Sequence, residues 1–252
     1  MSDLYWLTDE QRARLEPSFP RSHGRPRVDD RRVLRRIIFV NRNGLRWRDA
    51  PREYGSHKTL YNRWKRWGAM GIFARMMDGL AAGRLDHQTI MMDAAYLKAH
   101  RTASSLQIKK GGPGRLIGRT KGGMNTKLHA VTDRNGRPIR FLMTVGQISD
   151  YTGAAALLDD LPAAKWLLAD RGYDADWFRN GLEEKGIRPC IPGRRSRTTP
   201  VSYDKRKYRR RNRIEIMFGR LKDWRRVATC DNRCLAVFFS AICLAATVMF
   251  WL

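Results

Sequence analysis

Residues 127–145 read KLHAVTDRNGRPIRFLMTV and carry the strongest folding signal in the chain. Asn135 and Gly136 stand between two apolar runs, and an Asn-Gly pair in that setting is typical of a β-hairpin turn, because both residues tolerate positive φ angles. The runs at 127–131 and 139–145 are therefore predicted to be two paired antiparallel strands.

The flanking segments extend this hairpin into an alternation of strands and helices. Short apolar runs predict three more strands, and capped or amphipathic segments predict three helices. We place the strands at 88–93, 166–170 and 188–191, and the helices at 150–161, 176–185 and 207–224. This order predicts a mixed α/β sheet covered by helices. Residues 94–132 contain no acidic residue, and the glycines before the hairpin indicate that this basic stretch is a loop.

The first 85 residues are predicted to form a separate helical domain. Thr8 and Gln11 make a capping box for a first helix. A second helix is expected to start at Asp29 or Asp30 and to end at Gly44, and a third is expected to start near Ser56.

The third of these helices is basic and includes Arg63 and Arg66. Short helices that end in a basic helix resemble a helix-turn-helix DNA reader. The alternative is a three-helix bundle whose basic face is only solvated.

The charge balance points to a polyanionic partner. The chain has 252 residues, with 50 Lys and Arg against 24 Asp and Glu, so its net charge is +26. Nucleic acid is the simplest partner for such a charge, and a basic solvated surface is the alternative. Four cysteines without metal-ligand spacing predict reduced thiols, and no signal peptide is recognised, so we expect a cytoplasmic, nucleoid-associated protein.

Residues 234–252 form a run of 19 residues without a charge. A run of this length is compatible with a membrane span. Small residues are interspersed with large ones, which favours a helix buried in the protein core.

Three carboxylates stand out by their context. Asp93 and Asp170 each end an apolar run, and Glu215 lies within residues 193–226, which hold 14 Lys or Arg and only three acids. Buried carboxylates need a cation, and oxygen ligands favour Mg²⁺ or Mn²⁺. Two such ions support phosphoryl transfer. The alternatives are structural roles for the two aspartates and an ion pair between Glu215 and Arg211.

Four side chains share one face of the predicted helix around Glu215. The spacings from Tyr208 to Arg211, to Glu215 and to Lys222 are three, four and seven residues. A glutamate on this face can ligate a metal ion while its basic neighbours contact phosphates.

This face and three other segments resemble a known family. The pattern Tyr208-x2-Arg211-x3-Glu215-x6-Lys222 is similar to the signature around the catalytic glutamate of bacterial insertion-sequence DDE transposases. The blocks DRGYD at 170–174, MDAAY at 92–96, RTKGGMNTKLH at 119–129 and GLRWRDAP at 44–51 resemble the insertion-sequence-5 family.

The resemblance implies a ribonuclease-H-like catalytic domain over residues 86–252. Asp93, Asp170 and Glu215 would be its catalytic residues and the ligands of two Mg²⁺ or Mn²⁺ ions. Arg211 and Lys222 would contact DNA phosphates, and Tyr208 would support the same face. Arg171 and Lys127 are further candidate DNA contacts, with surface or core roles as the alternative. The apolar C-terminus would be a core-covering helix rather than a membrane anchor.

The leading hypothesis is a transposase that acts on double-stranded DNA. It would bind the terminal inverted repeats through residues 1–85, cleave the 3′ ends and join them to target DNA. A homodimer is expected because two ends must be joined. The alternatives are a catalytically decayed DNA-binding regulator, a metal-dependent nuclease and a membrane-anchored protein.

Overall fold

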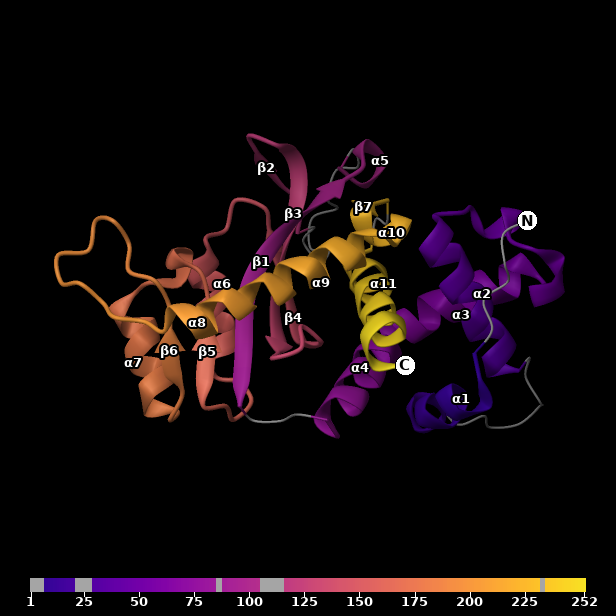
Figure 1. The fold of residues 1–252 in the computed structure, drawn as a ribbon. Coiled ribbons are helices and arrows are strands. Elements are labelled where there is room, and N and C mark those ends of the chain that lie inside the picture. The colour runs from indigo at the N-terminus through magenta and orange to yellow at the C-terminus, as the bar shows by residue number, and fades with distance from the viewer. Residues whose placement is uncertain (1–6, 21–28, 85–87, 105–115, 232–233) are drawn as a thin grey trace. The chain divides into compact units, whose positions relative to one another are not determined.

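The computed structural model describes residues 7–20, 29–84, 88–104, 116–231 and 234–252, which fall into two compact units (Figure 1). The helical unit is drawn from residues 1–80 and 221–252, and the sheet unit from residues 81–220. The domain boundary at residue 85 stays a prediction, but the structure groups the C-terminal segment with the N-terminal helices.

The sheet unit is built on a mixed sheet whose strand order is β2-β3-β1-β5-β6, with β4 also paired to β3. β3 is antiparallel to both β1 and β4, whereas β5 and β6 run parallel to β1. This arrangement confirms the predicted ribonuclease-H-like mixed sheet. The strand bounds are β1 Thr89–Ala99, β2 Gly118–Thr120, β3 Gly123–Asp133, β4 Pro138–Val145, β5 Trp166–Leu168 and β6 Arg188–Cys190.

The β3–β4 turn is confirmed at the Asn-Gly pair. Gly136 has a φ angle of +81°, which a residue with a β-carbon adopts only with strain. The buried carboxylate of Asp133 accepts hydrogen bonds from the backbone N–H groups of Asn135 (2.9 Å) and Arg137 (2.8 Å). These bonds fix the turn, so the pairing register of β3 and β4 is set locally.

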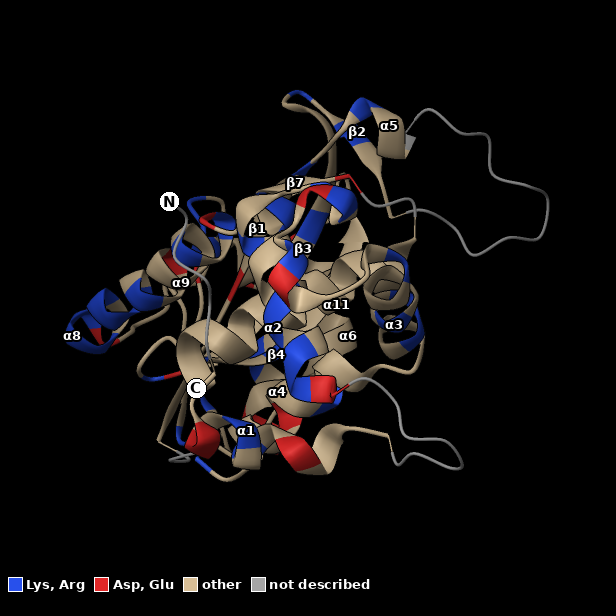
Figure 2. Ribbon diagram, turned by 90° about the vertical axis from the view of Figure 1, so that its right-hand side faces the viewer, with Lys and Arg blue, Asp and Glu red and all other residues tan. Residues whose placement is uncertain are grey.

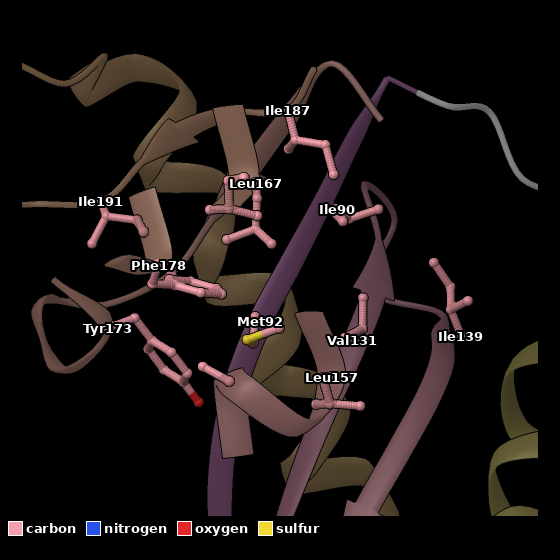
Figure 3. Packing of buried hydrophobic residues seen from close by; sticks show 13 residues of the cluster. Ile90, Met92, Val131, Ile139, Leu157, Leu167, Tyr173, Phe178, Ile187 and Ile191 are labelled. Carbon is pink, nitrogen blue, oxygen red and sulfur yellow. The ribbon is translucent and has the colours of Figure 1, made fainter. Parts of the chain in front are cut away.

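A hydrophobic cluster forms the core beneath one face of the sheet (Figure 3). The helices α6 (Asp150–Leu158) and α7 (Asp176–Glu184) contribute Leu157 and Phe178, which pack with Met92 of β1, Val131 of β3 and Leu167 of β5. Each of these five side chains is at most 5% exposed.

Two predicted elements differ from the structure. β1 continues to Ala99 because residues up to Lys98 pair with β3, so the predicted basic loop starts as a strand. It also contains the short helix α5 (Arg101–Ser104), and its glycine-rich centre at 111–114 lies outside the described residues.

The predicted helix over 207–224 is divided into shorter pieces. They are α8 (Lys205–Tyr208), the 3₁₀ turn Arg209–Arg211 and α9 (Asn212–Lys222). In Figure 1, α8 and α9 run across the sheet in front of β1.

The helical unit confirms the predicted helix starts. The capping box of Thr8 and Gln11 opens α1 (Asp9–Leu15), and Asp29 caps α2 (Asp30–Asn43), which ends at Gly44 with φ of +68°. The helix α3 (His57–Ala69) follows Ser56.

The connection between α2 and α3 spans residues 44–56 and contains two 3₁₀ turns, Trp47–Asp49 and Arg52–Tyr54. It is longer than the three or four residues of a helix-turn-helix turn. The short glycine-containing connection lies instead between α3 and α4 (Ile72–Ala82).

The apolar C-terminal segment completes the helical unit. After α10 (Arg225–Ala228) and β7 (Thr229–Cys230), α11 (Leu235–Ala246) packs against α3 and α2 and continues as a π-helical turn to Trp251. The predicted buried C-terminal helix is therefore present, and it belongs to the helical unit. Within the described ranges, no helix is both long and apolar enough to cross a membrane.

Candidate active site

The pairing of β1 with β5 places two of the predicted carboxylates at matching positions. Met91 is the parallel partner of Leu168. Asp93 and Asp170 each follow two residues later, and the negative charge of Asp170 acts on Asp93. Asp93 lies inside the long strand β1 rather than at its end, whereas Asp170 follows the end of β5 as predicted.

Arg211 joins the third carboxylate to this pair. Its Nη1 donates to Asp93 Oδ2 at 2.7 Å, and its Nη2 donates to Glu215 Oε1, one helical turn further on. The guanidinium also lies over the Tyr208 ring, with 5.7 Å to the ring centroid. The predicted intrahelical pair of Arg211 and Glu215 therefore exists, and it is part of a larger cluster.

The electrostatics show that the three carboxylates influence one another. Burial raises the pKa of Asp93 to about 6, and the contact with Arg211 only partly offsets this rise. The negative charges of Asp170 and Glu215 raise the pKa of Asp93 further. Burial and the neighbouring negative charges thus favour the protonated form of Asp93.

The local turn after β5 fixes Asp170. Its Oδ1 accepts a hydrogen bond of 2.8 Å from the Gly172 N–H, which caps the 3₁₀ turn Arg171–Tyr173. A β-carbon at Gly172 would lie 2.7 Å from Asp170 Oδ1 and 3.5 Å from Asp150 Oδ2. The glycine therefore lets two carboxylates approach the same point of the backbone.

Asp150 and Tyr173 lie near this cluster and were not predicted from the sequence. Asp150 is the first residue of α6, next to the capping Ser149, and nothing in its local sequence separates it from an ordinary helix start. Tyr173 is 1% exposed, and among the described residues its hydroxyl has no hydrogen-bond partner. Burial raises the pKa of Tyr173 above its usual value, and the charges of three aspartates raise it further: Asp150, Asp93 and Asp170.

Lys127 is buried, which argues against the predicted DNA contact. It is 5% exposed, its Nζ lies 2.8 Å from Asp150 Oδ1, and it donates to the Ile148 carbonyl oxygen at 3.0 Å. The residue therefore neutralises Asp150 from inside the protein.

The other predicted DNA contacts divide by exposure. Arg63 is buried and paired with Asp30 at 2.5 Å, so it stabilises the helical unit. Arg66, Arg171 and Lys222 are exposed on α3, the 3₁₀ turn and the end of α9, where a partner can reach them.

The described residues contain no group of three His, Cys, Asp or Glu side chains close enough to hold one metal ion. Arg211 lies between Asp93 and Glu215, where it supplies the positive charge that these carboxylates require. The donor atoms are all carboxylate oxygens, which suit Mg²⁺ or Mn²⁺ rather than zinc.

Comparisons with known proteins identify the family of the chain. Residues 7–77 match the family described as "Putative transposase of IS4/5 family", and residues 84–251 match the "Transposase DDE domain" family. A "Putative transposase for insertion sequence element IS6501" from Brucella ovis is 35% identical over 130 residues, which is 51% of this chain and 99% of that relative. A "Putative transposase for insertion sequence element IS402" from Burkholderia cepacia is 30% identical over 145 residues, 42% of this chain and 69% of that relative.

Among solved structures, the Mos1 transposase paired-end complex with left transposon end aligns with 82% of this chain and 82% of its own length. The identity is 11% and the TM-score is 0.27. The sequence families cover most of the chain, and the chain belongs to the DDE transposases of insertion sequences.

Proposed function

We propose that this protein binds the terminal inverted repeats of an insertion sequence and catalyses 3′-end cleavage and strand transfer at Asp93, Asp170 and Glu215. The observation that carries the proposal is the cluster around Arg211, which contacts Asp93, 118 positions earlier in the chain, and Glu215 on its own helix face. One arginine thus bridges two acids that are far apart in the sequence. Such a bridge favours a functional site over a local ion pair.

The donor set of these three residues, which is carboxylate oxygen alone, supports a pair of divalent cations. They would hold Mg²⁺ or Mn²⁺, and a cation beside Asp93 would offset the burial that raises its pKa. Such ions, when bound, neutralise charge on the reacting phosphate and favour the deprotonated form of the attacking water or 3′-hydroxyl.

The protein's own side chains position this centre. Arg211 orients Asp93 and Glu215, and the Gly172 N–H orients Asp170. Lys127 holds Asp150 near the Gly172 turn, so a fourth carboxylate faces the centre without adding its full negative charge. The reaction needs in-line displacement at phosphorus, for which correct positioning supplies much of the rate enhancement.

The exposed side of α3 is our candidate for the end-binding surface. A pocket of about 500 Å³ there is lined by basic and aromatic side chains, including Trp47, Lys58 and Tyr61. Lys65 lies over the Tyr61 ring at 5.8 Å. Cations combined with exposed rings suit contacts with phosphates and bases. Joining two ends requires a homodimer on DNA, which we include in the proposal.

The test uses purified protein, Mg²⁺ and a labelled duplex that bears the flanking inverted repeat. The wild type should release a 3′ end and join it to a second duplex. Asp93→Ala, Asp170→Ala and Glu215→Ala should abolish both products while end binding is retained. Asp160→Ala removes an exposed carboxylate of the same unit and should leave both products unchanged.

Two outcomes would contradict the assignment. Cleavage that persists in Asp93→Ala would remove that residue from the catalytic set. End binding by the wild type without any cleavage would favour the decayed DNA-binding regulator, and cleavage without joining would favour a metal-dependent nuclease.

A further inference from the structure

A small basic pocket lies beside the β3–β4 turn, and its side chains have no role in the proposed chemistry. The pocket has a volume of about 240 Å³ and is lined by four exposed residues: Arg134, Asn135, Arg210 and Arg213. In the described lining, three guanidinium groups and one amide face the pocket, and no carboxylate does.

The pocket is built by direct contact between the turn and α9. A β-carbon at Gly136 would lie 2.8 Å from the Arg213 carbonyl oxygen, so only a glycine permits this approach. Arg213 Nη1 also donates to the Arg134 carbonyl oxygen at 3.4 Å and to Asn135 Oδ1 at 3.2 Å. The two walls of the pocket are therefore tied together.

Asp133, the acid nearest to these arginines along the turn, does not line the pocket. Asp133 is 2% exposed, and its oxygens accept hydrogen bonds from two backbone N–H groups of the turn and from Arg137 Nε at 2.7 Å. Three guanidinium groups at one pocket repel one another, and a bound anion relieves that repulsion. The planar fork of donors on each arginine matches the oxygens of a phosphate group.

We propose that this pocket binds one phosphate of the DNA backbone, other than the phosphate that reacts. The inference rests on the proposed function for its ligand, because the DNA is the source of that phosphate. Arg210 immediately precedes Arg211, whose guanidinium contacts Asp93. Figure 2 shows that Lys and Arg continue along α8 next to this point. A DNA backbone bound in the pocket would therefore contact the residue next to the arginine of the acidic centre.

The first experiment is a double-mutant cycle on DNA binding. The affinity of wild-type protein for the inverted-repeat duplex is compared with that of Arg134→Ala, Arg210→Ala and the double variant, at several salt concentrations. Arg209→Ala is the matched control, because Arg209 is an exposed arginine of the same turn that does not line the pocket.

If one phosphate is shared, Arg134→Ala and Arg210→Ala each weaken binding severalfold, and the double variant loses less than the product of the two single losses. The slope of log affinity against log salt should fall by about 0.9 for the lost phosphate contact. Arg209→Ala and Arg134→Ala should combine additively. Additive losses at Arg134 and Arg210, or no loss, would overturn the pocket and leave the transposase proposal intact.

The second experiment uses inorganic phosphate, so that the pocket is tested even if no DNA is bound. Phosphate should raise the thermal midpoint of the wild type more than chloride does at equal ionic strength. Arg134→Ala and Arg210→Ala should lose this difference, and Arg209→Ala should keep it. If the phosphate results are as expected but the wild type does not bind DNA, the proposed function is rejected and an anion site is retained. An equal phosphate effect in all variants would reject the site.

Discussion

Asp93 and Asp174 both lie in the sheet unit and both contact arginine, yet their surroundings move their pKa values in opposite directions. Burial raises the pKa of Asp93 to about 6, and the contact with Arg211 only partly offsets this rise. Burial also acts to raise the pKa of Asp174, but hydrogen bonds from the Arg194 N–H and from Arg179 outweigh it and lower the pKa.

The two sites differ in how completely the carboxylate is satisfied. Asp174 is 1% exposed at its side chain and accepts bonds from the Arg194 N–H (2.8 Å), Arg179 Nε (2.8 Å) and Arg197 Nη1 (3.1 Å). Asp93 has the Ala94 N–H and Arg211, with two further carboxylates nearby. The negative charge of a structural acid is balanced by hydrogen bonds and ion pairs. The negative charge of a ligand-binding acid is balanced only in part until the ligand binds.

The largest expected effect on stability is at the compensated acid. Asp174→Ala leaves the buried guanidinium of Arg179 without its partner, and we expect it to lower the free energy of unfolding by about 3–5 kcal/mol. Urea denaturation measures the change, with Asp160→Ala as the exposed control. A loss below about 1 kcal/mol would contradict this view of Asp174.

The pH dependence should have opposite signs at the two acids. Between pH 3.8 and about 6 the folded state keeps a proton on Asp93 that the unfolded chain has lost, so this residue stabilises the fold less as the pH rises. Asp93→Asn lacks this dependence. Its stability relative to the wild type should therefore rise by about 2 kcal/mol from pH 4 to pH 7, in metal-free buffer.

Asp174→Asn provides the matched comparison for that measurement. Because the pKa of Asp174 is lowered, its ionised form stabilises the fold at pH values above the usual aspartate pKa. This stabilisation is lost as the pH falls through the lowered pKa. The free energy of unfolding of the wild type, relative to that of Asp174→Asn, should therefore increase as the pH rises. The same sign of pH dependence for both variants would refute the contrast.

A third test separates positioning from stability. Gly172→Ala adds a methyl group 2.7 Å from Asp170 Oδ1, so the carboxylate must move. We expect cleavage to fall by roughly 100-fold, because displacements of about 1 Å at a reacting centre have effects of this size. Gly219→Ala, which meets no atom within 4 Å, is the control and should retain activity. Equal activity in both variants would show that Asp170 needs no such placement.

The smallest effect concerns competition between Arg211 and a divalent ion. Arg211→Gln should bind Mn²⁺ roughly tenfold more tightly than the wild type, about 1.4 kcal/mol, because the guanidinium no longer competes for Asp93. The rise in thermal midpoint with Mn²⁺ measures this, and Arg209→Gln is the control. Unchanged Mn²⁺ affinity in Arg211→Gln would mean that the arginine does not occupy the cation's place.

Local chemistry explains which parts of the fold could be predicted. The Asn135-Gly136 turn, the Thr8 capping box and the Gly44 helix end depend on neighbouring residues, and all three were predicted correctly. The extension of β1 to Ala99 depends on hydrogen bonds from β3, which no local pattern contains.

The candidate site shows the same division. The family signature and the positions of Asp93, Asp170 and Glu215 identified candidates that the structure brings into electrostatic contact. Asp150 and Tyr173 join them only through the tertiary fold, and Lys127 is buried where it pairs with the half-buried Asp150. A basic residue in the sequence does not reveal whether its partner is internal or external.

The helical unit is assembled from the two ends of the chain, and this has a consequence for biosynthesis. During translation all of residues 81–220 leave the ribosome before α11, whose side chains pack against α3. The sheet unit can therefore finish folding first, while α3 still lacks the C-terminal helix that packs against it. A premature stop codon after residue 220 would spare the proposed catalytic carboxylates and damage the helices at the opposite end of the gene.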